Sequence, residues 1–249
     1  QENVSIIMPC HNGANYIAQA IKSVQNQSFP DWELLIINDA SSDESAQIVL
    51  SFAQTDNRIK LFSTNKSTGF PASVRNVGLS YAKGRYIAFL DCDDVWLPTK
   101  LENQLLKFRE NNVAVVFSYY KKIDSNGKIH KRIVKSPSIL TYKRLLGGNA
   151  IGNLTGIYDT QKVGKVFQKN IYHEDYLMWL EILSQGFIAV NTNTVEALYR
   201  EQKNSLSANK VKSFVWTYRI FRKELSLSFA FSLFCFLRYA VRGFFKRLS

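Results

Sequence analysis

Three carboxylates, Asp91, Asp93 and Asp94, stand within four residues directly after the apolar run 86–90. An apolar run that ends in polar residues is typical of a buried strand reaching the edge of a sheet. Carboxylates this close repel one another unless a cation or several hydrogen-bond donors lie near them. Asp91 and Asp93 can converge on one hard divalent ion, which binds through a few carboxylates and a substrate's phosphates. The alternative is a solvated acidic turn.

A second acidic pair, Glu174 and Asp175, follows His173 and precedes apolar residues that recur at helical spacing. This pattern predicts that both acids lie in the first turn of a helix. Acids at that place interact favourably with the helix dipole, which by itself can explain them. The spacing leaves both a structural and a chemical role open.

The first half of the chain alternates short apolar runs with helical patterns. Strands are predicted at residues 4–9, 34–37, 59–62, 86–90 and 113–117. This alternation predicts a parallel, doubly wound α/β sheet, whose ligand crevice lies beyond the carboxyl ends of the strands. Pro9, Asp39 and the acidic cluster fall at such ends. Ser41 and Glu44 match a capping box for the helix that follows Asp39.

The first turn contains no Gly-x-Gly-x-x-Gly, so the fingerprint of ordinary dinucleotide dehydrogenases is absent. After residue 118 the strict alternation fades. Asn126-Gly127 predicts a β-hairpin, a Gly- and Asn-rich loop covers 148–155, and two further strands are predicted at 187–190 and 195–199.

Composition describes a folded protein with an uneven charge. Hydrophobic residues make up 46% of the 249 residues, and the net charge is +12. Residues 1–100 hold 8 basic and 10 acidic residues, a balance of −2, whereas the remainder holds 24 and 10, a balance of +14. Such a division indicates an acidic metal and nucleotide half and a basic half that faces an anionic partner.

Cysteine usage and hydropathy indicate the cellular compartment. Three scattered cysteines favour neither a disulfide framework nor a zinc site, which indicates a reducing compartment. No signal peptide is visible, and the apolar run 225–237 is shorter than the roughly 18 to 20 residues that span a bilayer. We expect a cytoplasmic protein.

Five motifs together resemble those of the family 2 glycosyltransferases, which are nucleotide-sugar enzymes of the glycosyltransferase A fold. In chain order they are Val4-Ser-Ile-Ile-Met-Pro-Cys-His-Asn, Ile37-Asn-Asp-Ala-Ser-Ser-Asp, Arg75-Asn-Val-Gly, Phe89-Leu-Asp-Cys-Asp-Asp-Val-Trp and Glu174-Asp-Tyr-Leu-Met-Trp-Leu. The resemblance covers residues 3–207. It implies a Rossmann-like, mostly parallel sheet, inverting transfer of a sugar from a UDP-sugar, and Mn or Mg as cofactor.

The resemblance also implies a role for each matching residue. Asp39 would contact the uracil or ribose, with Pro9, His11 and Asn12 walling the nucleoside. Arg75 would brace the acidic cluster or the nucleotide. Within the acidic cluster, Asp93 would be the main metal ligand, Asp91 would help to bind the metal or the nucleotide, and Asp94 would support its neighbours.

The acidic pair would act on the acceptor, with Asp175 as catalytic base and Glu174 positioning the acceptor or serving as the second-choice base. A sugar hydroxyl is a poor nucleophile near neutral pH, so a carboxylate has to accept its proton, and partial burial has to raise the pKa of that carboxylate.

One departure concerns the loop after Tyr199-Arg200. Many relatives carry a His shortly after this pair, where Gln202 and Lys203 stand here. A protein metal ligand on this loop is therefore in doubt. Arg200 and Lys203 could hold the diphosphate in a closing lid, and the alternative is a solvated basic loop.

The chain divides into a catalytic domain, residues 1–207, and a basic, aromatic-rich helical segment, residues 208–249. This segment either lies on an anionic membrane surface at the inner face of the cell membrane, which we prefer, or packs against the catalytic domain or a second copy in a homodimer. The leading function is glycosyl transfer to a lipid-linked, polyprenyl diphosphate glycan for a surface polysaccharide such as O-antigen or capsule. The alternative is a non-catalytic basic module that binds an anionic polymer; the basic residues show no motif for nucleic acid.

Overall fold

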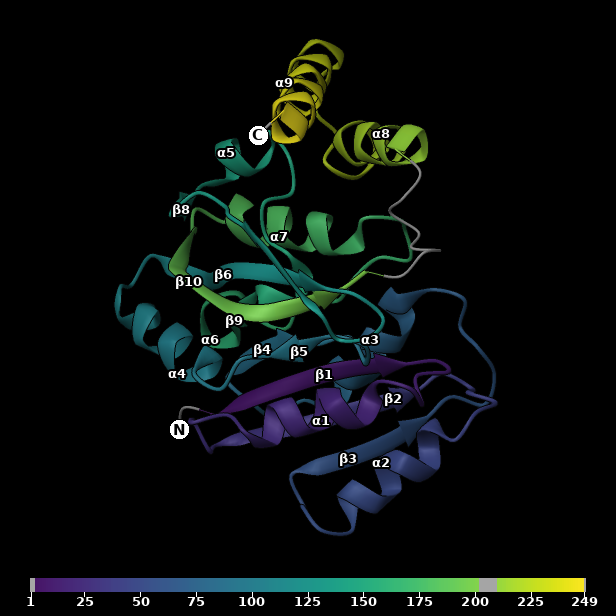
Figure 1. The fold of residues 1–249 in the computed structure, drawn as a ribbon. Helices are drawn as coiled ribbons and strands as arrows, with labels where there is room; N and C mark the ends of the chain where they lie inside the picture. Colours follow the sequence, from purple (N-terminus) through teal and green to yellow (C-terminus); the bar gives the residue numbers. More distant parts are fainter. Residues whose placement is uncertain (1–2, 202–209, 249) are drawn as a thin grey trace.

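A computed structural model describes residues 3–201 and 210–248 (Figure 1). Strands and helices alternate through the first half as predicted: β1 (Val4–Cys10), α1 (Ile17–Gln25), β2 (Trp32–Asn38), α2 (Ser45–Ala53), β3 (Ile59–Ser63), α3 (Pro71–Tyr81) and β4 (Tyr86–Phe89). These four strands are parallel in the order β3-β2-β1-β4. The register pairs Cys10 with Asn38 and Ile7 with Phe89, so the carboxyl ends of β1, β2 and β4 meet at one edge.

The second half completes a ten-stranded sheet, in the order β3-β2-β1-β4-β9-β6-β10-β5 with β7 and β8 off this path. Its elements are β5 (Val95–Trp96), α4 (Lys100–Leu105), the 3-10 helix η1 (Leu106–Arg109), β6 (Val113–Ile123), β7 (Ile129–Val134), β8 (Ile139–Leu140), α5 (Tyr142–Leu145), the 3-10 helix η2 (Asn153–Thr155), β9 (Ile157–Asp159), α6 (Thr160–Val163), α7 (Glu174–Ser184) and β10 (Ile188–Arg200). The longest pair, β6 with β10, is parallel, whereas the short strands and the β6–β7 hairpin pair antiparallel. The α/β prediction is confirmed.

Two apolar clusters cover the two faces of the sheet because neighbouring residues of a buried strand point to opposite sides. In β1, Ile7 belongs to one cluster and Ile6 to the other. Gly78 matters on the first face, since a Cβ there would lie 2.7 Å from Ile7 and Ile37 side-chain atoms. Its missing side chain lets α3 approach the sheet closely, which fixes the height at which Arg75 stands above it.

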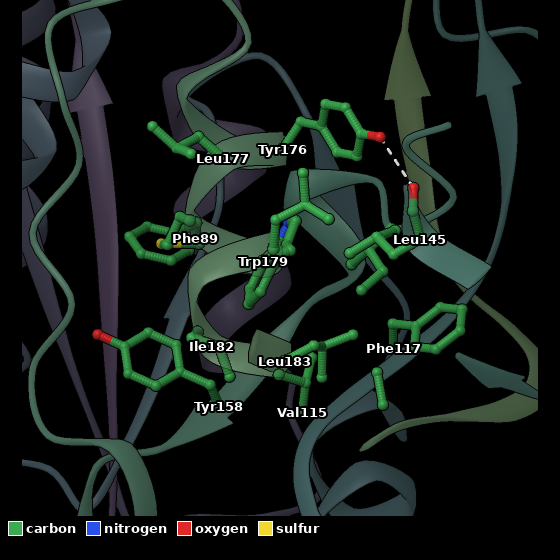
Figure 2. Packing of buried hydrophobic residues seen from close by; sticks show 14 of the residues in the cluster. Phe89, Val115, Phe117, Leu145, Tyr158, Tyr176, Leu177, Trp179, Ile182 and Leu183 are labelled. Atoms are coloured by element: carbon green, nitrogen blue, oxygen red, sulfur yellow. Dashed lines mark hydrogen bonds between the residues drawn. The ribbon is translucent and has the colours of Figure 1, made fainter. Parts of the chain in front are cut away.

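Helix α7 is anchored on the same face by Trp179 (Figure 2). The indole packs edge-on against Phe89 at 6.4 Å and Tyr158 at 6.3 Å between ring centroids. All three side chains are buried. This aromatic contact holds α7 against β4 and β9, and it places the acidic pair at the start of α7 above the end of β4.

Two local predictions were wrong. The capping box of Ser41 and Glu44 does not form, because Ser41 accepts the Asn12 N–H and α2 begins at Ser45. Asp43 organises this turn instead, accepting the backbone N–H groups of Ser45 and Ala14. The two strands predicted at 187–190 and 195–199 are one strand, β10, whose pairing with β6 shifts register between Asn191 and Val195.

The C-terminal segment forms α8 (Lys210–Arg219), a π-helical turn η4 (Ile220–Glu224) and α9 (Phe229–Leu248), which lie beside α5 and α7 at the top of Figure 1. Ile220, Phe221 and Cys235 are buried in the cluster that also contains α7. The alternative to the membrane prediction, packing on the catalytic domain, is therefore observed for part of this segment. No helix within the described ranges is long and apolar enough to span a membrane.

Candidate active site

A cavity of about 350 Å³ opens where β1, β2 and β4 end. Its lining includes six residues for which the sequence analysis predicted binding of the nucleotide or metal, or support of those binding residues, namely Pro9, His11, Asp39, Arg75, Asp91 and Asp93. The parallel register of the three strands brings together residues up to 84 positions apart in the chain.

Asp39 is fixed by the loop that follows β3. Its carboxylate accepts hydrogen bonds from the hydroxyl groups of Thr64 and Ser67, both at 2.9 Å, and from the backbone N–H of Thr68 at 3.0 Å. Asp39 is only 5% exposed. The carboxylate therefore ties the 64–68 segment to the end of β2, and a nucleoside contact to Asp39 stays a prediction.

His11 and Asn12 take different positions. His11 lines the cavity, and its Nδ1 lies 2.7 Å from the backbone oxygen of Asp39. Asn12 has a positive φ of 52°, and its side-chain oxygen accepts the N–H of Ser42 at 2.9 Å. Asn12 is not among the cavity residues, and it holds the two loops together from outside.

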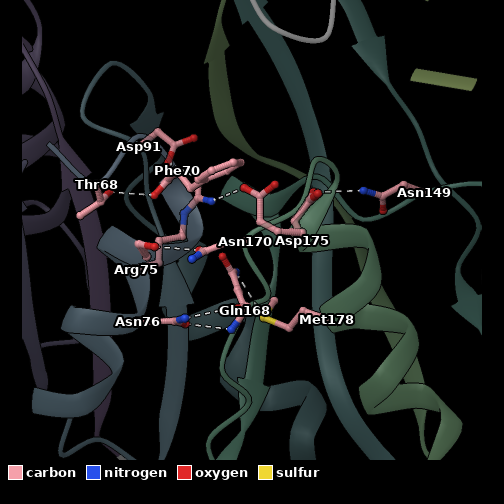
Figure 3. Close-up of polar contacts among 12 residues, drawn as sticks. Thr68, Phe70, Arg75, Asn76, Asp91, Asn149, Gln168, Asn170, Asp175 and Met178 are labelled. Carbon is pink, nitrogen blue, oxygen red and sulfur yellow. Dashed lines mark hydrogen bonds and ion pairs between the residues drawn. The ribbon is translucent and has the colours of Figure 1, made fainter. Parts of the chain in front are cut away.

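Arg75 joins the acidic cluster to the acidic pair (Figure 3). Its guanidinium donates to Asp91 at 2.8 Å and to Glu174 at 2.7 Å, and the residue is 5% exposed. Burial by itself lowers the pKa of Arg75, but the charges of Asp91 and Glu174 raise it more, so the group stays charged. The predicted bracing of the acidic cluster by Arg75 is present, and the link to Glu174 was not foreseen.

Asp175 lies beside this network at the start of α7. Burial raises its pKa, against the opposing effects of Arg75, the Tyr176 N–H and Asn149. The Asn149 amide donates to Asp175 Oδ2 at 3.0 Å (Figure 3). The pKa of Glu174 is also raised, by burial first and by Asp175, while Arg75 lowers it. The raised pKa that a base at this position needs is thus provided by its surroundings.

Asp94 and Arg200 support the acidic cluster from beneath. Asp94 is 1% exposed, and burial raises its pKa well above the ordinary range for a carboxyl group. It accepts the backbone N–H of Arg200 at 2.8 Å. The Arg200 guanidinium, 2% exposed, donates to the backbone oxygens of Asp93 and Asp124 and to Gln19. These bonds hold Arg200 within the protein, while Lys203 lies outside the described residues.

A divalent cation fits the exposed side of this cluster. Asp91 and Asp93 are both half-exposed and line the cavity, whereas Asp94 is turned inward. No group of three His, Cys, Asp or Glu side chains able to hold a metal occurs in the part of the chain that the structure describes. Mg and Mn commonly bind through one or two carboxylates together with substrate phosphates. Asp91 and Asp93, both on the cavity, are the residues that would hold such an ion.

Several cavity residues escaped the sequence analysis. Cys10 and Cys92 both line the cavity, and the neighbouring Cys92 thiol is the first cause of a Cys10 pKa lowered to about 7. Phe70 and Gly69 line the cavity from the loop before α3. Asn149, which contacts Asp175 and does not line the cavity, comes from the 148–155 loop. Loop residues carry no periodicity, so only the Gly- and Asn-rich composition of the second loop gave any signal.

Comparison with known proteins agrees with the geometry. Residues 5–162 match the family model described as Glycosyl transferase family 2. The chain is 40% identical over 210 residues to the Escherichia coli UDP-Glc:α-D-GlcNAc-diphosphoundecaprenol β-1,3-glucosyltransferase WfgD, covering 84% of this chain and 81% of that protein.

Solved structures share the fold at low identity. The Staphylococcus aureus TarS fragment 1–349 in complex with UDP-GlcNAc superposes with a TM-score of 0.77 and 21% identity, over 97% of this chain and 72% of that one. The mannosyltransferase PcManGT of Pyrobaculum calidifontis, in complex with GDP-Man and Mn2+, gives a TM-score of 0.70 and 16% identity over 92% and 65%.

Proposed function

Since this chain belongs to glycosyl transferase family 2, we propose that it moves a sugar from a UDP-sugar to a hydroxyl group of a lipid-linked, polyprenyl diphosphate oligosaccharide in surface polysaccharide synthesis. The observation that carries this proposal is the single network in which Arg75 joins Asp91, on the cavity, to Glu174, beside Asp175. A donor site and a carboxylate with a raised pKa are thereby adjacent. The names of WfgD and of the TarS complex support a UDP-sugar and a lipid-linked acceptor.

The donor would occupy the cavity, with its base toward Asp39 and its diphosphate toward Asp93. The TarS complex with UDP-GlcNAc supports a nucleotide sugar in this fold. Asp91 and Asp93 would hold Mn or Mg against the diphosphate, an assignment supported by their exposure on the cavity and by the Mn2+ in PcManGT. A bound divalent ion would neutralise charge on the leaving diphosphate without a proton.

Asp175 would act as the base. It accepts the proton of the acceptor hydroxyl, the freed oxygen forms a bond to the anomeric carbon, and the bond from that carbon to the diphosphate oxygen breaks, releasing UDP. One displacement of this kind inverts the anomeric centre. Asp175 is the better candidate of the acidic pair, because the carboxylate of Glu174 is committed to Arg75. The raised pKa of Asp175 makes it a stronger proton acceptor than an ordinary aspartate.

We also propose that the protein works at the inner face of the cell membrane. Helix α9 leaves large apolar side chains exposed although its other side packs on the protein: Phe229 (63%), Phe231 (41%), Leu233 (41%), Phe234 (53%) and Leu237 (55%). From Arg238 onward its sequence also contains Arg242, Lys246 and Arg247. Exposed apolar residues with basic neighbours suit the interface of an anionic leaflet, where a lipid-linked acceptor would be found.

The decisive experiment is a panel of nucleotide sugars, each incubated with Mn or Mg and a synthetic GlcNAc-diphosphate-lipid. We expect release of UDP from one donor, dependent on both the acceptor and the metal, with a product of inverted configuration by NMR. Absence of turnover with every donor, together with no thermal stabilisation by UDP and Mn, would refute the enzyme assignment. It would favour the non-catalytic binding module, because the balance of +14 after residue 100 would attract an anionic polymer.

A further inference from the structure

Three aromatic rings form a row that begins at the cavity and ends at α8. Phe70 lines the cavity, and its ring lies 6.1 Å from Tyr172, centroid to centroid. Tyr172 in turn stacks on Trp216 of α8 at 4.0 Å, with 14° between the ring planes. Tyr172 is 43% exposed, and Phe70 and Trp216 are half-buried. We call Phe70, Tyr172 and Trp216 the aromatic shelf.

The middle ring of the aromatic shelf, Tyr172, lies just before the acidic pair in the chain. Tyr172 precedes Glu174 by two residues, and His173 between them adopts a left-handed conformation with φ of 61°. A non-glycine residue in that region is uncommon and marks a sharp change of chain direction. The turn lets the backbone enter α7 while Tyr172 remains outside it, against Trp216.

The segment that carries Tyr172 is fixed from two sides. Asn76 and Gln168 exchange two hydrogen bonds of 2.8 Å, and Ser73 donates to Asn170 at 2.7 Å, so α3 holds residues 168–170 (Figure 3). From α8, Ser213 lies 3.0 Å from His173 Nε2. Rigid positioning before binding reduces the entropy lost when a ligand is held.

We propose that the aromatic shelf binds a sugar ring of the acceptor, an inference that rests on the proposed glycosyl transfer. A pyranose ring presents C–H groups on its faces and hydroxyl groups around its edge, so one face packs on an aromatic ring while the edge stays hydrated. Large half-exposed aromatic side chains provide such contact area. Tyr172 comes two residues before the acidic pair and Trp216 contacts His173, so this end of the shelf is near the place where the acceptor hydroxyl must reach Asp175, while Phe70 connects the shelf to the cavity proposed for the donor. Trp216 thereby makes the C-terminal segment part of the acceptor site.

The test is a comparison of Tyr172→Ala, Trp216→Ala and Tyr172→Phe in the full-length protein. With a synthetic GlcNAc-diphosphate-lipid, we expect the acceptor KM of each alanine variant to rise about tenfold, with the KM for the UDP-sugar changed less than about twofold. Tyr172→Phe keeps the ring and should retain the acceptor KM of the parent. Calorimetric titration of the same lipid in the absence of donor should show the same order of affinities.

A matched control is available because Tyr81, 51% exposed, stacks on Phe62 at 4.2 Å with the same 14° between the planes. Tyr81 stands at the far end of α3 from the cavity, so Tyr81→Ala should leave the acceptor KM unchanged. Equal acceptor affinity in the parent and both alanine variants would overturn the proposal that the aromatic shelf binds the acceptor. A rise in the donor KM that matches the rise in the acceptor KM would also overturn it. A parent protein that binds the lipid through the shelf but transfers no sugar would overturn the proposed function alone.

Discussion

The Nη1 atom of Arg75 lies 2.7 Å from Oε1 of Glu174, which joins α3 to the start of α7. The same guanidinium donates to Asp91, so one cation serves both carboxylate groups. The carboxylates of Asp91, on the cavity, and Glu174, at the start of α7, are therefore held at a fixed separation by one side chain. Removing that side chain should affect stability and catalysis together.

Arg75→Met should lower the free energy of unfolding by about 3 kcal/mol, because breaking a buried ion pair leaves the partner charges uncompensated. Glu174 is affected most, since its side chain is only 16% exposed compared with 38% for Asp91. Urea unfolding followed by circular dichroism measures the change. Lys60→Met is the control, because Lys60 is 41% exposed and Glu33 keeps its hydrogen bonds from the Ser5 hydroxyl and the Lys83 N–H, so the loss should be less than about 1 kcal/mol. Equal losses in the two variants would contradict this account.

The sequence predicted well which residues meet at the cavity, because periodicity locates the ends of strands. Parallel strands bring those ends to one edge, so Pro9, Asp39 and Asp91 could be placed together before any coordinates. The acidic pair was correctly placed at the start of a helix for the same reason.

Contacts between side chains distant in the sequence were not predictable. Arg75 and Glu174 are 99 residues apart, and Asn149 and Asp175 are 26 apart. Nothing in local hydropathy specifies such pairs, because they depend on how α3, α7 and the 148–155 loop pack. The sequence analysis placed Arg200 in a lid or a solvated loop for the same reason. Its partners, the backbone oxygens of Asp93 and Asp124, are distant in the sequence, so the local pattern did not show that Arg200 is buried.

Asp93→Ala and Asp175→Asn should separate binding from chemistry. Asp93→Ala removes a predicted ligand of the divalent ion, so Mn-dependent binding of UDP, measured by calorimetry, should fall at least about a hundredfold. Asp175→Asn keeps the shape but cannot accept the proton, so UDP should bind normally while transfer falls at least about a thousandfold. Equal loss of UDP binding in both variants would place Asp175 in the donor site instead.

Asn149→Ala should change the pH dependence of transfer. Asn149 donates to the carboxylate of Asp175 and so lowers its pKa, while its own Oδ1 accepts the Ile151 N–H and fixes the direction of the amide. Losing this donor raises the pKa of Asp175 further, so the acidic limb of the kcat profile should move to higher pH. At a pH below that limb, kcat should fall about tenfold, whereas the plateau at higher pH should change less.

The charged groups around Asp175 define the controls for this experiment. Arg75 lowers the pKa of Asp175 and Asp91 raises it, while the charge of Asp175 raises the pKa of Glu174. Asn149→Asp adds another negative charge beside Asp175 and should move the limb further in the same direction. An acidic limb at the same pH in parent, Asn149→Ala and Asn149→Asp would show that Asp175 is not the titrating base.

Arg200→Ala should act through the acidic cluster. The variant loses hydrogen bonds to the backbone oxygens of Asp93 and Asp124, which leaves partly buried acceptors without this donor, and we expect a loss of about 2 kcal/mol in unfolding free energy. The loop that carries Asp93 should loosen, which raises the Kd for UDP with Mn. Lys203→Ala tests the lid prediction separately: a normal melting temperature with a raised donor KM would support a lid, and an unchanged donor KM would refute it.

Replacing Phe229, Leu233 and Leu237 together by Glu should release the protein from anionic vesicles. The three residues recur every four positions along α9 and are all exposed, so the change removes one apolar side and adds negative charge facing the lipid. Deleting the whole segment would be less informative, because it would uncover the core around Ile220 and Phe221.

The matched control places Glu at Leu50, Leu106 and Ile129, which are 49%, 51% and 50% exposed on other elements and should leave vesicle binding unchanged. Co-sedimentation with phosphatidylglycerol vesicles measures binding, and analytical ultracentrifugation without lipid reports self-association. Loss of sedimentation in the α9 variant alone would support the membrane assignment, because that face then binds lipid directly. A parent protein that ignores vesicles but forms a dimer, broken by the α9 substitutions, would assign the same face to a second copy of the chain.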